Sequence, residues 1–192
     1  MFGVYLTHPQ VTIDPTVPVP EWGLSDLGRE RTRATAGQVW VRSLGRIVSS
    51  KEKKAIETAA TLAEAAGTAV ETDEEMGEND RSATGFLPPQ EFEKAADWFF
   101  AHPDESFRGW ERASDAQRRI SAAVSYILDR HDPTVPIAFV GHGGVGTLLK
   151  CQMMGRSIGR SDQLPGGGNL FAFRLADRCV TCDWTPMEFW QG

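Results

Sequence analysis

Two histidines stand directly after apolar segments that have the character of buried strands. His8 follows the run 3–6 after one intervening residue, and His142 follows the run 136–140 in the same way. Ligands of α/β sheets bind outside the carboxyl ends of the strands, so we expect the two imidazoles to share one cleft. A neutral imidazole can attack phosphorus while a carboxylic acid protonates the leaving oxygen, and a second histidine can hold the transferred group. The pair therefore predicts phosphoryl transfer.

The glycine-rich run around His142, FVGHGGVGTLL over residues 139–149, also fits a dinucleotide-binding loop. Gly141, Gly143 and Gly146 satisfy G-x-G-x-x-G, and Asp162 stands at about the distance of a ribose-binding acid. However, Asp162 belongs to a loop-like segment rich in glycine and proline rather than to the end of a second strand. Too little chain follows Gly146 for the usual pair of mononucleotide-binding halves. We interpret this match as accidental.

A third interpretation is an esterase in which residues 142–144, His-Gly-Gly, form an oxyanion loop. Its nucleophile would be Ser157, in the G-x-S-x-G of residues 155–159. That motif needs a strand before the serine and a helix after it, whereas here a predicted helix precedes it and a loop follows. The same fold places its histidine after the serine, and no histidine follows His142. The phosphoryl interpretation is therefore favoured.

The elements that must position these residues alternate between short apolar strands and amphipathic helices. The predicted strands are 3–6, 46–50, 68–72, 136–140, 170–175 and 179–184. The predicted helices are 25–43, 52–66, 89–101, 114–130 and 145–154. This alternation predicts an α/β fold, a three-layer sandwich whose mostly parallel central sheet carries helices on both faces. A length of 192 residues predicts one domain over 1–192.

Composition excludes several classes of protein. The net charge is −6 and no basic cluster interleaved with aromatic residues occurs, so nucleic acid is not an expected partner. No apolar run is long enough to cross a bilayer and no basic leader precedes the first strand, so we expect a cytoplasmic protein with no membrane partner. Three cysteines argue against a disulfide framework, and Cys179-x-x-Cys182 is interpreted as two incidental thiols.

Five short motifs follow one another in a fixed order along the chain. They are THPQV at 7–11, WGLSDLG at 22–28, SSKEKKAIETA at 49–59, MGE at 76–78 and GHGGV at 141–145. In this order, with the predicted strands and helices between them, they resemble the histidine phosphatase superfamily, the phosphoglycerate-mutase-like proteins. In that family the first strand ends in Arg-His-Gly-(Gln/Glu)-Thr, and a later motif reads Ser-Ser-Pro-x-x-Arg-Ala-x-Gln-Thr-Ala. The resemblance covers most of the chain.

The resemblance implies a role for each of six residues. His8 would be the nucleophile, Glu78 the acid and His142 a contact of the phosphoryl group. The residues implied around the phosphate are Lys54, Gly143 and Gln10. The implied activity is phosphomonoester hydrolysis rather than mutase chemistry, acting on a phosphorylated small molecule or a phosphoprotein, with no metal and no organic cofactor.

The sequence departs from the family pattern at three positions around the phosphate. Thr7 stands in place of an arginine, Pro9 in place of a glycine and Lys54 in place of a second arginine. Arginine holds two phosphate oxygens with a planar fork, whereas lysine is a point charge. Replacement cations would have to come from Lys51, Lys53, Arg81 or Arg31. Two hypotheses stay open: a retuned phosphatase, or a catalytically impaired one that acts as an anion- or partner-binding module.

Overall fold

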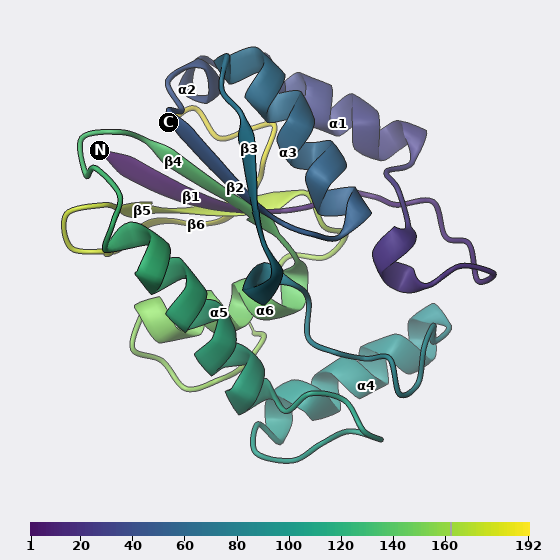
Figure 1. Cartoon of the computed structure of the whole chain (residues 1–192). Helices are drawn as coiled ribbons and strands as arrows, with labels where there is room; N and C mark the ends of the chain where they lie inside the picture. The colour runs from purple at the N-terminus through teal and green to yellow at the C-terminus, as the bar shows by residue number, and fades with distance from the viewer. Residues whose placement is uncertain (162) are drawn as a thin grey trace.

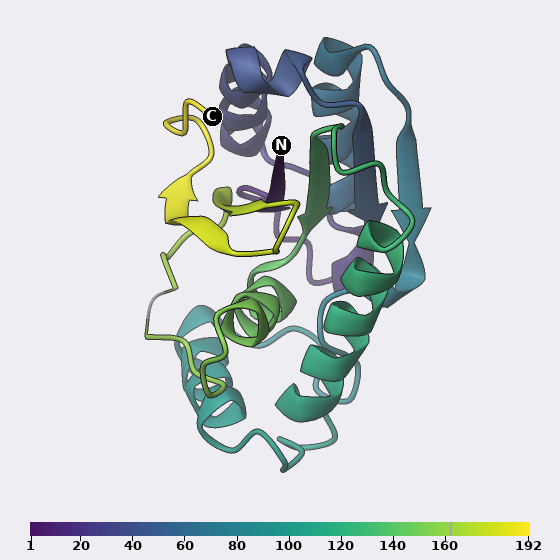
Figure 2. The same ribbon diagram turned by 90° about the vertical axis from the view of Figure 1, so that its left-hand side faces the viewer.

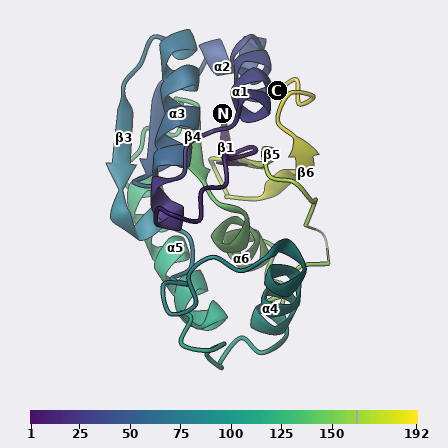
Figure 3. The same ribbon diagram turned by 90° about the vertical axis from the view of Figure 1, so that its right-hand side faces the viewer.

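The strands form one mixed sheet at the centre of the molecule. The computed structural model describes residues 1–161 and 163–192, and Asp162 lies outside them. Over these residues the sheet has six strands in the order β3-β2-β4-β1-β5-β6, with β3 and β6 at its two edges (Figure 3). The first four in this order run parallel, β5 is antiparallel to β1, and β6 is antiparallel to β5. Their bounds are β1 Phe2–Thr7, β2 Arg46–Ser50, β3 Val70–Asp73, β4 Ile137–Gly141, β5 Asn169–Arg174 and β6 Val180–Pro186.

Helices cover both faces of this sheet, which confirms the predicted three-layer α/β sandwich (Figures 1 and 2). One face carries α1 Asp26–Ala36, α2 Val39–Arg42 and α3 Lys53–Ala66. The other carries α5 Ala113–Leu128 and α6 Gly143–Met153, and α4 Pro89–Ala101 lies beyond α6, farther from the sheet. None of the helices in the described part of the chain is long and apolar enough to cross a membrane.

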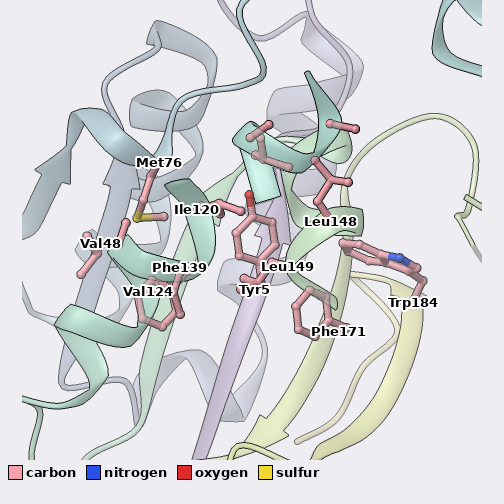
Figure 4. Close-up of a cluster of buried hydrophobic side chains, with 14 of the residues drawn as sticks. Tyr5, Val48, Met76, Ile120, Val124, Phe139, Leu148, Leu149, Phe171 and Trp184 are labelled. Carbon is pink, nitrogen blue, oxygen red and sulfur yellow. The ribbon is translucent and has the colours of Figure 1, made fainter. Parts of the chain in front are cut away.

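Both faces of the four inner strands β2, β4, β1 and β5 are buried, as expected for strands with helices on either side. Side chains alternate along β1, so that Val4 and Leu6 belong to one apolar cluster and Tyr5 to the other. In the second cluster Tyr5 stacks on Phe171 at a centroid distance of 5.6 Å and lies close to Phe139, below α6 (Figure 4). These two clusters anchor β1 at the middle of the sheet.

The predicted helix 25–43 is wrong in its extent, because the structure divides it into α1 and α2. Ser25 caps α1 by accepting from the amide of Gly28, as expected, but the helix ends at Ala36 and Gly37 follows. Glycine is a poor helix residue, and the new direction after it turns Trp40 into the apolar cluster beneath α3. The segment 73–88, between a predicted strand and a predicted helix, contains the 3₁₀ turn Glu74–Met76.

The register of the parallel strands brings three chain segments to one edge of the sheet. Thr7 pairs with Gly141, and Ser49 pairs with Val140, so β1, β2 and β4 end side by side. The residues just after these ends are therefore neighbours in space, although the sequence separates them widely. This edge holds the candidate site.

Candidate active site

His8 is placed at the carboxyl end of β1 with one ring nitrogen already engaged. Its backbone amide donates to the carbonyl of Gly141 at 2.9 Å, and its Nδ1 lies 2.8 Å from the carbonyl of Pro9. A carbonyl can only accept, so in the neutral ring Nδ1 carries the hydrogen and Nε2 carries the lone pair. Burial lowers the pKa of His8 to about 3, and the neighbouring His142 acts in the same direction. At neutral pH, His8 therefore presents an unprotonated Nε2.

His142 lies beside His8, with ring centroids 5.3 Å apart. Tyr5 fixes its backbone, because the Tyr5 hydroxyl accepts from the His142 amide at 3.1 Å and donates to the His142 carbonyl at 3.3 Å. The His142 Nε2 lies 2.8 Å from the Ser50 hydroxyl and 3.2 Å from Oε1 of Glu52. Burial lowers the pKa of His142, and the carboxylates only partly oppose this. A carboxylate can only accept, so Nε2 carries the hydrogen that faces Glu52.

Glu78 reaches the start of α6 from the loop that follows the 3₁₀ turn. Its Oε2 accepts from the amide of Gly144 and its Oε1 from the amide of Val145, both at 3.0 Å. Burial opposes its ionisation, but Arg81, His142 and the amide hydrogen bonds together lower the pKa of Glu78. Without substrate the side chain is therefore a carboxylate at a helix N-terminus, a position that favours negative charge.

The position of Glu78 depends on features of two other segments. A Cβ at Gly144 would lie 2.5 Å from Oε1 of Glu78, so this approach of the carboxylate to the helix requires glycine. Arg119 on α5 holds the loop itself, donating to the carbonyl of Gly77 at 3.0 Å and to that of Glu78 at 3.3 Å. One further glycine of the run, Gly146, leaves room for the ring of Tyr5. Gly146, which had suggested a nucleotide loop, thus serves packing around Tyr5, and Gly144 serves the approach of Glu78.

Glu52, which the sequence did not single out, lies at the centre of the site. It is the N-cap of α3, and its side chain is 15% exposed. One oxygen forms an ion pair with Lys54, and the other accepts from the amide of Glu78 at 3.0 Å and lies 3.2 Å from His142 Nε2. Burial opposes ionisation, but His142, Lys54 and these hydrogen bonds lower the pKa of Glu52 to about 2. A resident carboxylate thus engages donors that a phosphate would use.

The positions that depart from the family pattern have acquired other contacts. Thr7 is tied to β5: its hydroxyl accepts from the amide of Asn169 at 3.0 Å and donates to its carbonyl at 3.3 Å. Pro9 offers the carbonyl that orients His8. Besides its pairing with Glu52, Lys54 Nζ donates to the carbonyl of Val19 at 2.9 Å. None of these three contacts adds a cation for an incoming anion.

Of the four replacement cations suggested by the sequence, Arg81 is the one that lines the cleft. Its guanidinium carbon lies 4.9 Å from the ring centroid of Phe92, and its charge acts on Glu78. Lys51 pairs with Glu74 on the surface. The remaining two also point elsewhere: Lys53 is exposed, and Arg31 binds Glu188 and the carbonyls of Gly167 and Gly168.

The two remaining predicted phosphate contacts differ in their surroundings. Gly143 is the first residue of α6 and lines the cleft. Within the described residues, the backbone amides of Gly144, Val145 and Gly146 have hydrogen-bond acceptors, and none is found for the amide of Gly143. Gln10 donates to Gly166 at 2.8 Å, accepts from Arg31 at 3.1 Å and lines neither cavity of the cleft. A phosphate contact stays a prediction for both Gly143 and Gln10.

Two cavities open on His8. The smaller, of about 270 Å³, lies between α4 and the start of α6, and the larger, of about 680 Å³, lies between the segments 11–22 and 78–93. Asn79 lines both and is 6% exposed, and its Nδ2 has no hydrogen-bond partner among the described residues. A buried donor without a partner costs about 1–3 kcal/mol, so an oxygen bound in the cleft would satisfy it.

Neither Asn79 nor Glu52 was predicted as a site residue. Glu52 could have been suspected, because it stands two positions after Ser50 at the end of a strand. Asn79 gives no such signal, since its placement follows an irregular loop. No group of three or more histidine, cysteine or acidic side chains is gathered for a metal within residues 1–161 and 163–192, and Cys179 and Cys182 are free thiols.

Comparison with known protein families identifies the chain. The histidine phosphatase superfamily (branch 1) matches residues 17–171, and the chain belongs to this family. The match begins after His8, so the role of this histidine as the nucleophile stays a prediction. A comparison with curated proteins gives no match.

Several solved structures share the fold over nearly the whole chain. A mycobacterial glucosyl-3-phosphoglycerate phosphatase bound to inorganic phosphate is 21% identical with a TM-score of 0.78, covering 100% of this chain and 97% of that one. Bacillus stearothermophilus YhfR is 19% identical with a TM-score of 0.81, covering 97% and 98%. A mutant phosphoserine phosphatase from Entamoeba histolytica, in complex with phosphoserine, is 16% identical with a TM-score of 0.76, covering 98% and 99%. At these identities the likeness establishes the fold.

Proposed function

We propose that this protein hydrolyses phosphomonoesters through a phosphohistidine at His8. The observation that carries the proposal is the neutral His8 ring, whose Nδ1 is held by Pro9 while Nε2 keeps its lone pair beside His142. In the first step Nε2 would form a bond to phosphorus as the bond to the ester oxygen breaks. Glu78 would give that oxygen its proton.

The second step would regenerate the enzyme. Glu78, now a carboxylate, would take a proton from water as the water oxygen attacks the phosphohistidine, which releases inorganic phosphate and restores His8. The amide of Gly143 and Nδ2 of Asn79 would stabilise the charge on the transferred oxygens.

The proposal requires that Glu78 gain a proton when substrate binds. In the absence of substrate its pKa is lowered. A phosphate dianion placed beside it is a like charge, which raises the pKa of a carboxyl group. Binding itself would then convert Glu78 from an anion into an acid, with the proton taken from water or from a monoanionic substrate.

Phosphorylated small molecules are the proposed substrates in preference to phosphoproteins. The names of two similar structures refer to such compounds, glucosyl-3-phosphoglycerate and phosphoserine. The two cavities that open beside His8, of about 270 and 680 Å³, have sizes that suit a compact ligand. A cytoplasmic location stays a prediction.

The proposal is tested by trapping the phosphoenzyme. Purified protein is mixed with a phosphate ester and quenched in alkali within the first turnover, and the peptides are mapped by mass spectrometry. We expect a phosphate group on the peptide that contains His8. Label on the exposed His102 instead, or turnover without any phosphoenzyme, would contradict the assignment of the nucleophile. Absence of both turnover and label across a panel of phosphate esters would overturn the hydrolase.

A second candidate function is an anion- or partner-binding module without catalysis. The observation that favours it is Glu52, whose carboxylate already engages Lys54 and His142. An internal anion at this place repels an incoming phosphate, and Thr7 supplies no cation to compensate. Binding of phosphate without turnover would support this candidate over the hydrolase.

Replacing Glu52 measures how strongly this carboxylate opposes phosphate. We expect Glu52→Gln to bind inorganic phosphate about tenfold more tightly, because a like charge leaves the site and Lys54 gains the phosphate as its counter-ion. The dissociation constant is measured by isothermal titration calorimetry at pH 7. Glu74→Gln, which removes the same charge from a surface pair with Lys51, serves as the control. Equal or weaker binding by Glu52→Gln would show that the carboxylate does not compete with phosphate.

A further inference from the structure

The larger cavity beside His8 has an apolar wall that the proposed chemistry does not use. It is formed by Trp110 and by two segments of the chain, 11–22 before α1 and 85–92 leading into α4. Trp22 and Phe86 join the two segments across the cavity, with ring centroids 5.5 Å apart. We call the following set the apolar wall: Ile13, Trp22, Phe86, Leu87, Phe92 and Trp110.

Part of the apolar wall is exposed although it is hydrophobic. Ile13 is 52% exposed and Phe86 is 38% exposed. Removing apolar surface from water contributes about 25 cal/mol per Å², so a ligand group that covers these side chains gains binding energy from them. Because His8 and Glu78 line the same cavity, the covering group would be attached to the reacting phosphate. The wall thus lies where a leaving group would extend.

The charges around this cavity do not suit a leaving group that carries a carboxylate. Its ionisable lining consists of four carboxylates and two cations besides His8: Glu52, Glu78, Asp80, Glu93, Lys54 and Arg81. Lys54 is paired with Glu52, and Arg81 acts on Glu78. Within the described lining, a carboxylate on the substrate would therefore meet more negative than positive charge. Phosphate esters of hydroxy acids are disfavoured on this account.

We infer that the preferred substrate is a phosphomonoester of an uncharged aromatic or hydrocarbon alcohol, with the alcohol packed on the apolar wall. This inference rests on the proposed function, because it concerns the leaving group of that reaction. It differs from what the names of two similar structures state, since both glucosyl-3-phosphoglycerate and phosphoserine carry a carboxylate. The apolar wall would act on binding and positioning of the alcohol and not on the bond changes at phosphorus.

Turnover of three esters of primary alcohols tests the preference without a large change in leaving-group acidity. The substrates are ethyl phosphate, 3-phenylpropyl phosphate and phosphoserine. We expect kcat/KM for 3-phenylpropyl phosphate to exceed that for ethyl phosphate at least about tenfold, with phosphoserine lowest. Phe86→Ala should lower kcat/KM for 3-phenylpropyl phosphate much more than for ethyl phosphate and so remove most of the advantage. Phe189→Ala, at a 69% exposed site outside the cavity, is the matched control.

Binding of non-hydrolysable phosphonates tests the wall independently of catalysis. We expect 3-phenylpropylphosphonate to bind at least about tenfold more tightly than 3-phosphonopropionate, and Phe86→Ala or Ile13→Ser to abolish the difference. Both sites are partly exposed, so neither variant removes core packing. Equal binding, or a preference for the carboxylate, would overturn the inference. Turnover without a preference for the apolar ester would also overturn the inference about the substrate, but the proposed hydrolase activity would remain. Preferential binding of the apolar phosphonate without any turnover would support the ligand class and overturn the proposed hydrolase activity.

Discussion

The His8→Ala variant is expected to lose phosphatase turnover by a factor of about 10³ or more. The variant lacks the atom that would form the bond to phosphorus, so only direct attack by water remains, which forfeits the covalent route and its positioning. A factor of 10³ corresponds to about 4 kcal/mol of transition-state stabilisation. Because the neutral ring contributes one backbone-directed hydrogen bond to Pro9, its removal should leave the sheet intact.

The measurement compares kcat/KM of wild type and variant on the same ester, with circular dichroism to show that both are folded. His102→Ala is the control, since this histidine is exposed and lines neither cavity. Undiminished turnover in a folded His8→Ala protein would exclude His8 as the nucleophile. The activity would then have to be reassigned to another group of the cleft.

The second large effect is expected for Glu78→Gln, and its size should depend on the leaving group. An alkoxide is a poor leaving group and needs a proton, so loss of the acid should lower kcat/KM for an alkyl phosphate about 10²–10³-fold. A 4-nitrophenolate leaves without a proton, so 4-nitrophenyl phosphate should lose much less in the first step. Glutamine keeps one oxygen to accept from the amide of Gly144 or Val145, which limits the disturbance of α6.

The diagnostic quantity is the ratio of the two losses, measured as kcat/KM for ethyl phosphate and for 4-nitrophenyl phosphate. Glu75→Gln makes the same change on an exposed residue of the preceding 3₁₀ turn and should alter neither substrate's rate. If Glu78→Gln lowered both rates equally, Glu78 would have a positioning role and the acid would have to be sought elsewhere. Asp80 and Glu93 line the larger cavity and would be the next residues to replace.

The positions of the two histidines could be predicted because simple periodic patterns determine them. Apolar runs predicted β1 and β4, and the parallel sheet brings the ends of such strands to one edge. The division of the first predicted helix at Gly37 was missed. The apolar residues after it continue a helical pattern, although their burial requires a change of direction that only packing beneath α3 provides.

The surroundings of these histidines could be predicted only in part. Glu52 belongs to the charged run 51–54, which has the character of a solvated first helical turn. It is half-buried because Lys54 and His142 meet it in the folded chain. Asn79 and Arg81 lie on an irregular segment whose path depends on Arg119 and on the start of α6. Such a path has no period in the sequence, so residue type alone could not place them.

The central position of β1 has a consequence for how the chain folds. This strand pairs with β4 on one side and with β5 on the other, across separations of more than a hundred residues. During synthesis β1 therefore emerges long before either partner strand has been made, and its apolar residues stay unburied until then. Such long-range strand pairing makes folding slow and leaves an aggregation-prone intermediate with exposed apolar residues. We therefore expect the nascent protein to depend on chaperones until β4 and β5 are available.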